Sequence, residues 1–293
     1  MQTILTAIPC LREAQQIRTE LINVSANEVY GVEAGGQRYI LRLEGDQYGF
    51  MGLSKVGELE AVTQAAEMGL APKILAAGDG YLLMERIEGP LLDWSLLRQP
   101  AVTTELAALL KAIHRIHDVD RQLDVFAMLD RYLSGMKRLA VPHPPGLDEL
   151  LAGVPAMEDR WRARKTSCLG YSHNDFFPFN LIQSTQGIRL IDWELSGYGD
   201  VLFDLSTLSF TALYSEAEDE VLLSSYFGIV EPELRAGLRD MKVMNMLRDI
   251  GWSLLHAGLS PEWAEGLTAR AEKAIRLLRR GHLHFWCDCP EMG

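Results

Sequence analysis

Hydrophobic residues follow two patterns along the chain, short alternating runs before Gly89 and long helical periods after it. The alternating runs, separated by turns such as Gly35-Gly36, are typical of β-strands with one buried face. Residues 1–22 have near-helical spacing and predict a short helix or a mixed helix–strand entry. A polar turn leading into a strand is predicted at residues 23–32, and further strands are predicted at residues 37–43, 73–77 and 81–87. The first part therefore reads as a small antiparallel sheet.

One amphipathic helix, predicted at residues 53–69, interrupts these strands and ends at Gly69, a residue typical of helix C-termini. Glu58 and Glu60 lie near its start, where an acidic side chain favours the helix dipole. Either of them could also pair with Arg42, which lies on the predicted strand at residues 37–43. The sequence alone leaves open which of the two does so.

The remainder of the chain is mainly helical, which places the predicted domain boundary before Gly89-Pro90. The predicted helices cover residues 106–116, 124–139, 147–163, 202–214, 216–227, 231–258 and 261–280. The chain is longer than most single hydrophobic cores, which also favours two lobes. We therefore expect an α+β protein with an N-terminal lobe at residues 1–88 and a larger, mainly helical lobe at residues 89–293.

Composition and charge argue against a nucleic-acid-binding, a membrane or a secreted protein. The chain has 293 residues and a net charge of −12, which argues against nucleic-acid binding. No apolar run reaches the roughly 20 residues of a membrane helix, and residues 1–14 do not resemble a secretory signal. These features predict a cytoplasmic protein with no membrane partner and four reduced cysteines. A homodimer is compatible with the sequence.

The candidate chemistry lies between residues 168 and 194. His173, Asp175 and Asn180 follow a strand-like run, and a predicted hairpin at residues 181–191 then leads to Asp192. Such a hairpin would bring Asn180 and Asp192 to the same end, within reach of one oxygen-loving cation. Asp175 would face an acceptor hydroxyl. Three such groups between apolar strands suit transfer of a phosphoryl group from a magnesium nucleotide.

This arrangement resembles the aminoglycoside phosphotransferase / choline kinase superfamily, and most of all its bacterial choline/ethanolamine-kinase-like members. The resemblance rests on the motif His173-x-Asp175-x4-Asn180, on Ile191-Asp192-Trp193-Glu194 and on Gly199-Asp200-x3-Asp204-Leu205. Weaker likeness in the same order covers residues 39–43, 58–72, 82–89 and 109–114. The resemblance implies a protein-kinase-like two-lobed fold and a small-molecule kinase. Its expected acceptor is choline, ethanolamine or a similar amino alcohol.

The resemblance also implies roles for individual residues. Asp175 would be the catalytic base. His173 would support the loop of Asp175 through hydrogen bonds, and Asp204 would do the same from below. Asn180 and Asp192 would bind Mg²⁺. The residues expected at ATP are Ser25, Asn27, Ile40, Arg42, Glu58 (or Glu60), Glu85 and Ile87. The residues expected at the acceptor are Trp193, Glu194, Tyr226, Trp252 and Trp263. Aromatic faces and an acid of this kind would suit a quaternary ammonium.

Other hypotheses remain at this point. The acceptor could instead be thiamine, an aminoglycoside or another hydroxylated metabolite, and the chain could be a catalytically silent nucleotide-binding protein. The sequence lacks the glycines of a protein-kinase phosphate loop and has Trp193-Glu194 where protein kinases have Phe-Gly. Those departures argue against a protein kinase. A tail with His282, His284, Cys287 and Cys289 has zinc-binding atom types, but its spacing differs from that of common zinc sites.

Overall fold

The computed structural model describes residues 2–12, 14, 16–24, 27–45, 57–164 and 168–283. The chain forms two compact units. Unit 1 contains Met1–Leu91 and Leu181–Glu194, and unit 2 contains Leu92–Asn180 and Leu195–Gly293. Residues 181–194 thus fold with the N-terminal unit although they lie far along the chain. The boundary predicted after residue 88 stays a prediction.

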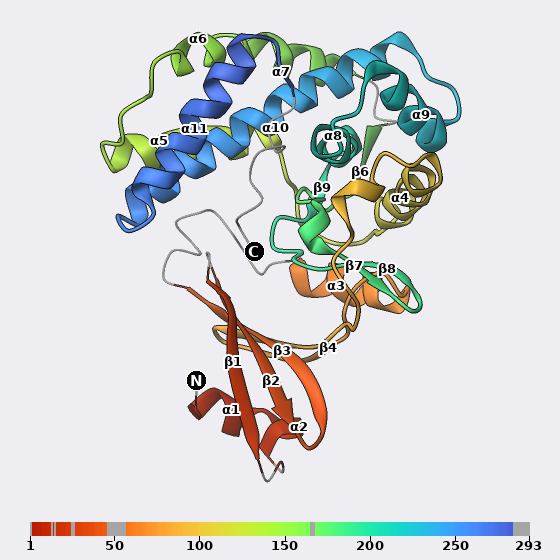
Figure 1. Cartoon of the computed structure of the whole chain (residues 1–293), viewed down its shortest axis with the longest axis vertical. Coiled ribbons are helices and arrows are strands. Elements are labelled where there is room, and N and C mark those ends of the chain that lie inside the picture. The colour runs from red at the N-terminus through yellow and green to blue at the C-terminus, as the bar shows by residue number, and fades with distance from the viewer. Residues whose placement is uncertain are drawn as a thin grey trace. The chain divides into compact units, whose positions relative to one another are not determined.

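Unit 1 is built on a five-stranded antiparallel sheet with the order β1-β2-β3-β5-β4 (Figure 1). Its strands are β1 (Ile17–Val24), β2 (Asn27–Ala34), β3 (Gln37–Glu44), β4 (Ile74–Gly78) and β5 (Tyr81–Glu85). The turn at Gly35-Gly36 joins β2 to β3, and both glycines have positive φ, which suits a tight hairpin turn. In this register Arg42 of β3 lies opposite Val29 of β2 and Leu82 of β5.

The N-terminal segment is a mixed helix–strand entry rather than one helix. Two short helices, α1 (Gln2–Ala7) and α2 (Pro9–Arg12), precede strand β1. Their buried residues Leu5, Ile8 and Leu11 form one cluster with sheet residues that include Leu41 and Leu83. Covering one face of the sheet in this way removes apolar surface from water and stabilises the unit.

Helix α3 (Glu58–Glu67) and a hairpin complete unit 1. The buried face of α3 is made by Glu58, Ala61, Val62 and Ala65. The hairpin consists of β7 (Leu181–Ser184) and β8 (Gly187–Leu190), paired in antiparallel register. It is tied to the rest of the unit by backbone hydrogen bonds from Leu190 N–H to the Leu70 carbonyl (2.7 Å) and from Gln183 N–H to the Pro90 carbonyl (2.9 Å).

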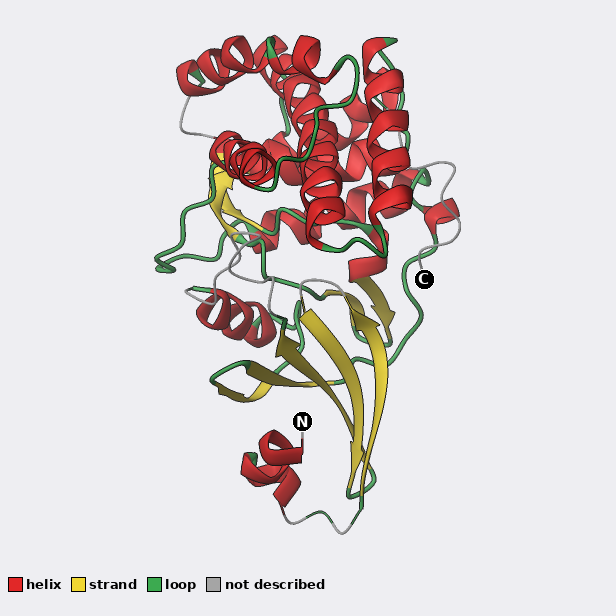
Figure 2. Ribbon diagram, turned by 90° about the vertical axis from the view of Figure 1, so that its left-hand side faces the viewer, coloured by secondary structure: helices red, strands yellow, loops and turns green. Residues whose placement is uncertain are grey.

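Unit 2 is mainly helical, as the red ribbons of Figure 2 show. Its longest described helix, α10, is buried along much of its length and packs against α5, α8 and α11. The predicted helix at residues 147–163 is divided in two around Gly153, with Pro155 in the first turn of the second helix. The helices are η1 (Trp94–Leu96), α4 (Pro100–Ile113), α5 (Val125–Arg138), α6 (Leu147–Leu151), α7 (Val154–Ala163), η3 (Pro178–Asn180), α8 (Val201–Thr211), α9 (Glu216–Phe227), α10 (Pro232–Leu259) and α11 (Ala264–Arg279).

A two-stranded sheet inside unit 2 positions the candidate chemistry. Strand β6 (Leu169–Ser172) pairs with β9 (Gly197–Asp200), so that Ser172 lies opposite Gly197. A Cβ atom at Gly199 would lie 2.5 Å from the Leu123 carbonyl oxygen, so this close approach requires glycine. Asp200 then caps α8 by accepting a hydrogen bond from the N–H of Leu202 at 2.9 Å.

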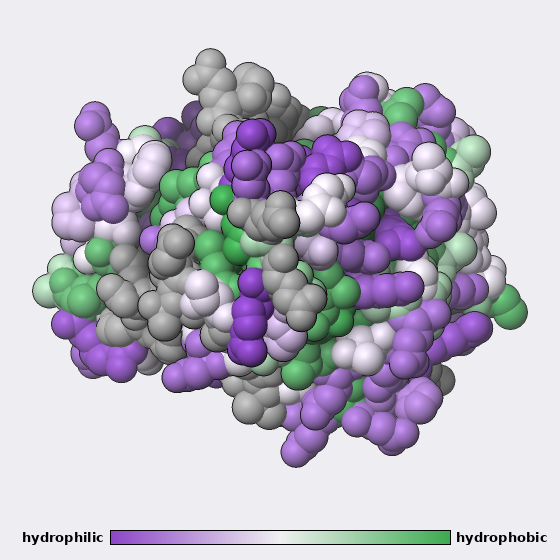
Figure 3. Space-filling model, turned by 90° about the horizontal axis from the view of Figure 1, so that it is seen from below, coloured by the Kyte–Doolittle hydropathy of each residue, from purple (hydrophilic) through white to green (hydrophobic). Residues whose placement is uncertain are grey.

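Hydrophilic side chains cover much of the face drawn in Figure 3, with hydrophobic ones in smaller groups between them. This mixture is ordinary for a folded protein surface. Among the helices of the described residues, none has the length and apolar character needed to cross a membrane.

Candidate active site

The catalytic loop, residues 172–180, joins β6 to η3 and has an unusual backbone turn at Asn174. The φ angle of Asn174 is +65°, a left-handed conformation that asparagine tolerates better than most residues. Its side-chain amide donates to the carbonyl oxygens of Ser172 (3.1 Å) and Leu195 (3.0 Å). The loop is therefore fixed by its own side chain before any ligand is present.

Asp204, in the first turn of α8, supports the same loop from a fully buried position. Its two carboxylate oxygens accept the backbone N–H groups of His173 and Asn174, each at 2.7 Å. Oδ2 also lies 3.0 Å from Nε2 of His114, whose Nδ1 is 2.7 Å from the hydroxyl of Tyr226. Burial raises the pKa of the Tyr226 phenol, and the nearby charge of Asp204 raises it further. This buried network holds the backbone that presents Asp175.

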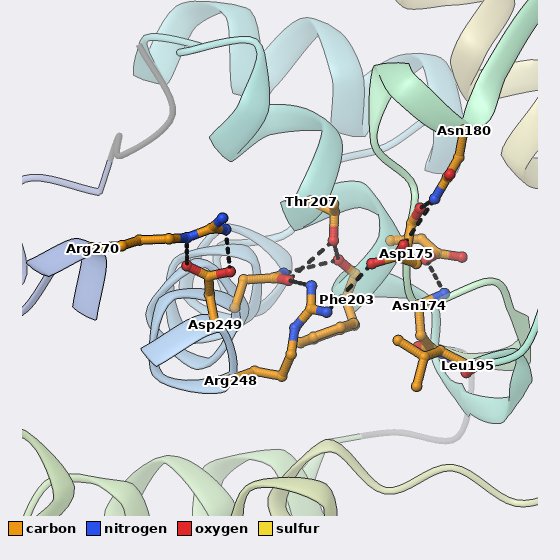
Figure 4. Close-up of polar contacts among 11 residues, drawn as sticks. Asn174, Asp175, Asn180, Leu195, Phe203, Thr207, Arg248, Asp249 and Arg270 are labelled. Atoms are coloured by element: carbon orange, nitrogen blue, oxygen red, sulfur yellow. Dashed lines mark hydrogen bonds and ion pairs between the residues drawn. The ribbon is translucent and has the colours of Figure 1, made fainter. Parts of the chain in front are cut away.

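Asp175 and Asn180 form the polar centre of the loop (Figure 4). The amide nitrogen of Asn180 donates to the backbone carbonyl of Asp175 at 2.9 Å and to its Oδ2 at 2.8 Å. Because both contacts use the nitrogen, the amide oxygen of Asn180 is the acceptor end and suits a hard cation. The structure thus brings together these two predicted residues, and His173, which precedes them in the loop, is fully buried.

Arg248 of α10 also reaches Asp175, and the sequence did not indicate it. Its Nη1 lies 3.3 Å from Asp175 Oδ1, the carboxylate oxygen that Asn180 does not contact. Figure 4 shows Asn180 and Arg248 approaching Asp175 from different sides. Arg248 is 73 residues from Asp175 in the chain, so no local motif could link them. The one available signal was a cation inside the long helix predicted at residues 231–258.

Unit 1 holds a second group of predicted residues, which we call the Arg42 cluster: Asn27, Arg42, Glu58, Asp192 and Glu194. Arg42 is buried and pairs with Glu58, and its Nη1 lies 3.7 Å from Asp192 and 3.9 Å from Glu194. Burial works against the charged guanidinium, but these three carboxylates outweigh it and raise the pKa of Arg42. The side chain of Asn27 donates to Glu194. Of the two glutamates that could pair with Arg42, Glu58 does so, while Glu60 is exposed.

Asp192 has features that suit a metal ligand. It lies two residues beyond the end of β8, has a φ of +64° and keeps 43% of its side chain exposed. Within the described residues no group of three or more His, Cys, Asp or Glu side chains is arranged to hold a metal. Mg²⁺ commonly needs only one or two protein ligands, because nucleotide phosphates and water supply the others. Asp192 of unit 1 and Asn180 of unit 2 each present an oxygen of the kind that Mg²⁺ binds.

The remaining residues predicted at ATP lie on unit 1, except that Ser25 is outside the described residues. Ile40 is half-buried on β3 opposite Met84, and Ile87 is half-buried just beyond β5. Glu85 donates its backbone N–H to the Lys73 carbonyl at 2.9 Å and accepts from Arg189 through its side chain at 2.8 Å. The backbone N–H of Glu85 is therefore already engaged within the unit, and the role of Glu85 and Ile87 at adenine stays a prediction.

The predicted acceptor residues do not form one group. Trp193 is buried, and its indole N–H donates to the Leu190 carbonyl at 3.0 Å, while Glu194 belongs to the Arg42 cluster. Tyr226 belongs to the network under the catalytic loop. Trp252, one turn beyond Arg248 on α10, stacks on His256 with ring centroids 5.0 Å apart. Trp263 is 63% exposed.

Comparison with known proteins identifies the family. The model of a family described as "Phosphotransferase enzyme family" matches residues 19–239. The chain belongs to this family. It is 24% identical to the protein LicA of Haemophilus influenzae over 75% of this chain and 84% of that protein.

Two solved structures show the same fold. A choline/ethanolamine kinase family protein from Mesorhizobium loti has a TM-score of 0.73 and 24% identity, covering 94% of this chain and 93% of that chain. The structure of LicA in complex with AMP has a TM-score of 0.70 and 21% identity, covering 94% of this chain and 97% of that chain.

Several predictions from the sequence are thereby confirmed. The chain has the expected two-lobed α+β fold of the kinase-like phosphotransferases, and the superfamily suggested by its motifs is correct. It is an ATP-dependent phosphotransferase of the small-molecule kinase class. The roles of single residues, the identity of the acceptor and the metal stay predictions.

Proposed function

We propose that this chain transfers the γ-phosphate of magnesium-ATP to the hydroxyl of a small amino alcohol, with choline and ethanolamine as first candidates. The observation that carries the proposal is the presentation of Asp175. Its loop is fixed through Asp204, and its carboxylate is oriented by Asn180. Similarity to the choline/ethanolamine kinase family protein of M. loti supports an amino alcohol as the acceptor.

In the proposed reaction the acceptor oxygen bonds to the γ-phosphorus, and the bond from that phosphorus to the β,γ-bridging oxygen breaks. ADP leaves, and Asp175 accepts the hydroxyl proton. Mg²⁺, when bound by Asn180 and Asp192, would neutralise charge on the phosphates. Arg42 would contact the α- and β-phosphates while Glu58 holds its guanidinium in place. The protein's contribution is then mainly orientation of the reacting groups, which can supply roughly 7–11 kcal/mol of the barrier.

The proposal is tested by ATP consumption against a panel of acceptors. We expect turnover with choline, ethanolamine or a related amino alcohol, and little with thiamine or aminoglycosides. Formation of the phosphate monoester is checked by phosphorus NMR, because ATP hydrolysis alone would also release ADP. Nucleotide-dependent thermal stabilisation without turnover on any acceptor would instead favour a catalytically silent nucleotide-binding protein. A cytoplasmic location suits access to ATP, and light scattering would show whether a homodimer forms.

The proposed metal role of Asp192 gives a separate prediction. Asp192→Ala should weaken magnesium-dependent ATP binding by about 100-fold or more, since even a change beside a metal ligand costs about 10- to 100-fold. Calorimetric titration of ATP with and without Mg²⁺ measures this directly. Asp79→Ala removes an exposed acid from a turn in the same unit and serves as the matched control. Equal magnesium dependence in the Asp192 variant and the wild type would remove Asp192 from the metal site.

A further inference from the structure

Arg248 is a buried cation beside the proposed catalytic base. It lies on α10 with only 6% of its surface exposed. Its guanidinium carbon is 5.6 Å from the ring centre of Phe177 and 5.9 Å from that of Phe203. Rings on this scale of distance attract a guanidinium and restrict its movement. The charge is therefore held in one place next to Asp175.

The hydrogen-bonding capacity of this guanidinium is poorly used. Its Nη1 lies 3.3 Å from Asp175 Oδ1 and its Nη2 lies 3.5 Å from Asn245 Oδ1, both longer than ordinary N–H···O bonds. Its Nε is buried without a hydrogen-bond partner among the described residues. Leaving a buried charged donor unsatisfied is costly.

A neighbouring ion pair, between Asp249 of α10 and Arg270 of α11, shows a guanidinium whose hydrogen bonds are made. Asp249 follows Arg248 directly but is engaged by Arg270, whose Nη2 and Nε lie 2.6 Å and 3.2 Å from its two oxygens (Figure 4). Asp249 therefore pairs with Arg270 and not with Arg248. Arg248 has the planar fork that binds carboxylates in pairs of hydrogen bonds, yet it lacks such a partner.

The position of Arg248 indicates which ligand could accept the remaining hydrogen bonds of its guanidinium. Asn180, the proposed magnesium ligand, contacts Oδ2 and the carbonyl of Asp175, whereas Arg248 contacts Oδ1. The phosphate side of the carboxylate is therefore the Asn180 side, which leaves Arg248 to the acceptor. A hydroxyl bonded to Asp175 would lie within two hydrogen-bond lengths of the guanidinium. An anionic group close to that hydroxyl could reach it.

We propose that Arg248 binds a carboxylate of the acceptor, so that the substrate is an amino alcohol that also carries a carboxylate near its hydroxyl. This inference rests on the proposed phosphoryl transfer to a hydroxyl at Asp175. Choline and ethanolamine bring only a positive charge and leave the guanidinium with its long contacts to Asp175 and Asn245. A zwitterionic hydroxy amino acid supplies a second anion, which could bind both arms of the fork.

Acceptor pairs that differ by a carboxylate-bearing group test the proposal on the unaltered protein. Suitable pairs are ethanolamine and serine, 3-aminopropanol and homoserine, and choline and carnitine. For at least one pair we expect kcat/KM to be about 10- to 150-fold higher for the carboxylate member, the range expected for a hydrogen bond to a charged group. Calorimetry with ADP and Mg²⁺ present should show the same preference in binding.

Variants then connect the preference to Arg248. Arg248→Met should abolish the advantage of the carboxylate member, and Arg248→Lys, which keeps the charge but not the fork, should retain part of it. Arg160→Met is the matched control, because Arg160 makes a paired contact with Asp240 of the same helix but is 54% exposed. Thermal denaturation shows whether each variant is folded.

The possible failures are distinguishable. Turnover of ethanolamine or choline with no gain from a carboxylate would overturn the anion subsite and leave the proposed reaction standing. A loss of kcat in Arg248→Met that is equal for both members of each pair would also overturn it, since Arg248 would then act on Asp175 or on the phosphoryl group. No phosphorylation of any member would overturn the proposed function itself.

Discussion

Replacing Asp175 by asparagine is expected to lower kcat by about 10²- to 10⁴-fold, the usual contribution of a positioned general base. Asparagine keeps the shape of the side chain and an oxygen that can accept from Asn180 or Arg248, but it cannot take the hydroxyl proton. Binding of magnesium-ATP should remain nearly as in the wild type. Steady-state kinetics with an acceptor that the wild type phosphorylates measures the loss of kcat. Calorimetry measures ATP binding separately.

The alanine variant at Asp175 should be equally inactive, but for two reasons. It removes the base, and it leaves the guanidinium of Arg248 buried with no carboxylate partner from the loop. Removing one member of a buried ion pair is typically destabilising by about 3–5 kcal/mol, and the 18% exposure of Asp175 reduces that value here. Asp159→Ala, an exposed acid on α7, is the control for loss of a negative charge. Near-normal turnover in the asparagine variant would exclude Asp175 as the base.

The parts of the site that the sequence predicted are those encoded within short segments. Asp175 and Asn180 are five residues apart, and their contact needs only the loop between them. The hairpin leading to Asp192 was likewise readable from alternation and a turn. Helices such as α10 and α11 were found because long apolar periods determine helix position well. Local patterns therefore predicted the reaction class.

Contacts between distant segments were not predictable in the same way. Arg248 reaches Asp175 only because α10 packs beside α8 and the catalytic loop, and helical periodicity does not report which helices become neighbours. His114 shows the same limit. It lies near the end of the helix predicted at residues 106–116, and only the fold places it against Asp204. Such pairs require tertiary structure.

Strand β9 was not predicted, whereas β1 was predicted only as part of a short helix or a mixed helix–strand entry. β1 has a mixed polar sequence with most residues exposed, so its alternation is weak. β9 contains Gly197 and Gly199, and glycine is poor in strands by propensity. It forms because those glycines allow the close approach of residues 121–123. Tertiary packing outweighs local preference at β9.

The two glutamates at the start of α3 should differ sharply in effect, because only Glu58 pairs with Arg42. Both lie in the first helical turn, so their interactions with the helix dipole are similar and largely cancel in the comparison. Glu58→Ala should reduce the free energy of unfolding by about 2–3 kcal/mol. This is below the roughly 3–5 kcal/mol typical of a broken buried pair, because Asp192 and Glu194 still lie near Arg42.

The exposed Glu60 provides the matched control, and Glu60→Ala should stay within about 0.5 kcal/mol of the wild type. Urea unfolding followed by circular dichroism measures both variants. Glu58→Ala should also weaken ATP binding, since Arg42 loses the carboxylate that orients it toward the proposed phosphate position. Equal stability and equal ATP affinity in the two variants would show that Arg42 is held by the remaining carboxylates alone. A selective loss in Glu58→Ala would identify the buried pair as the support of the nucleotide-binding unit.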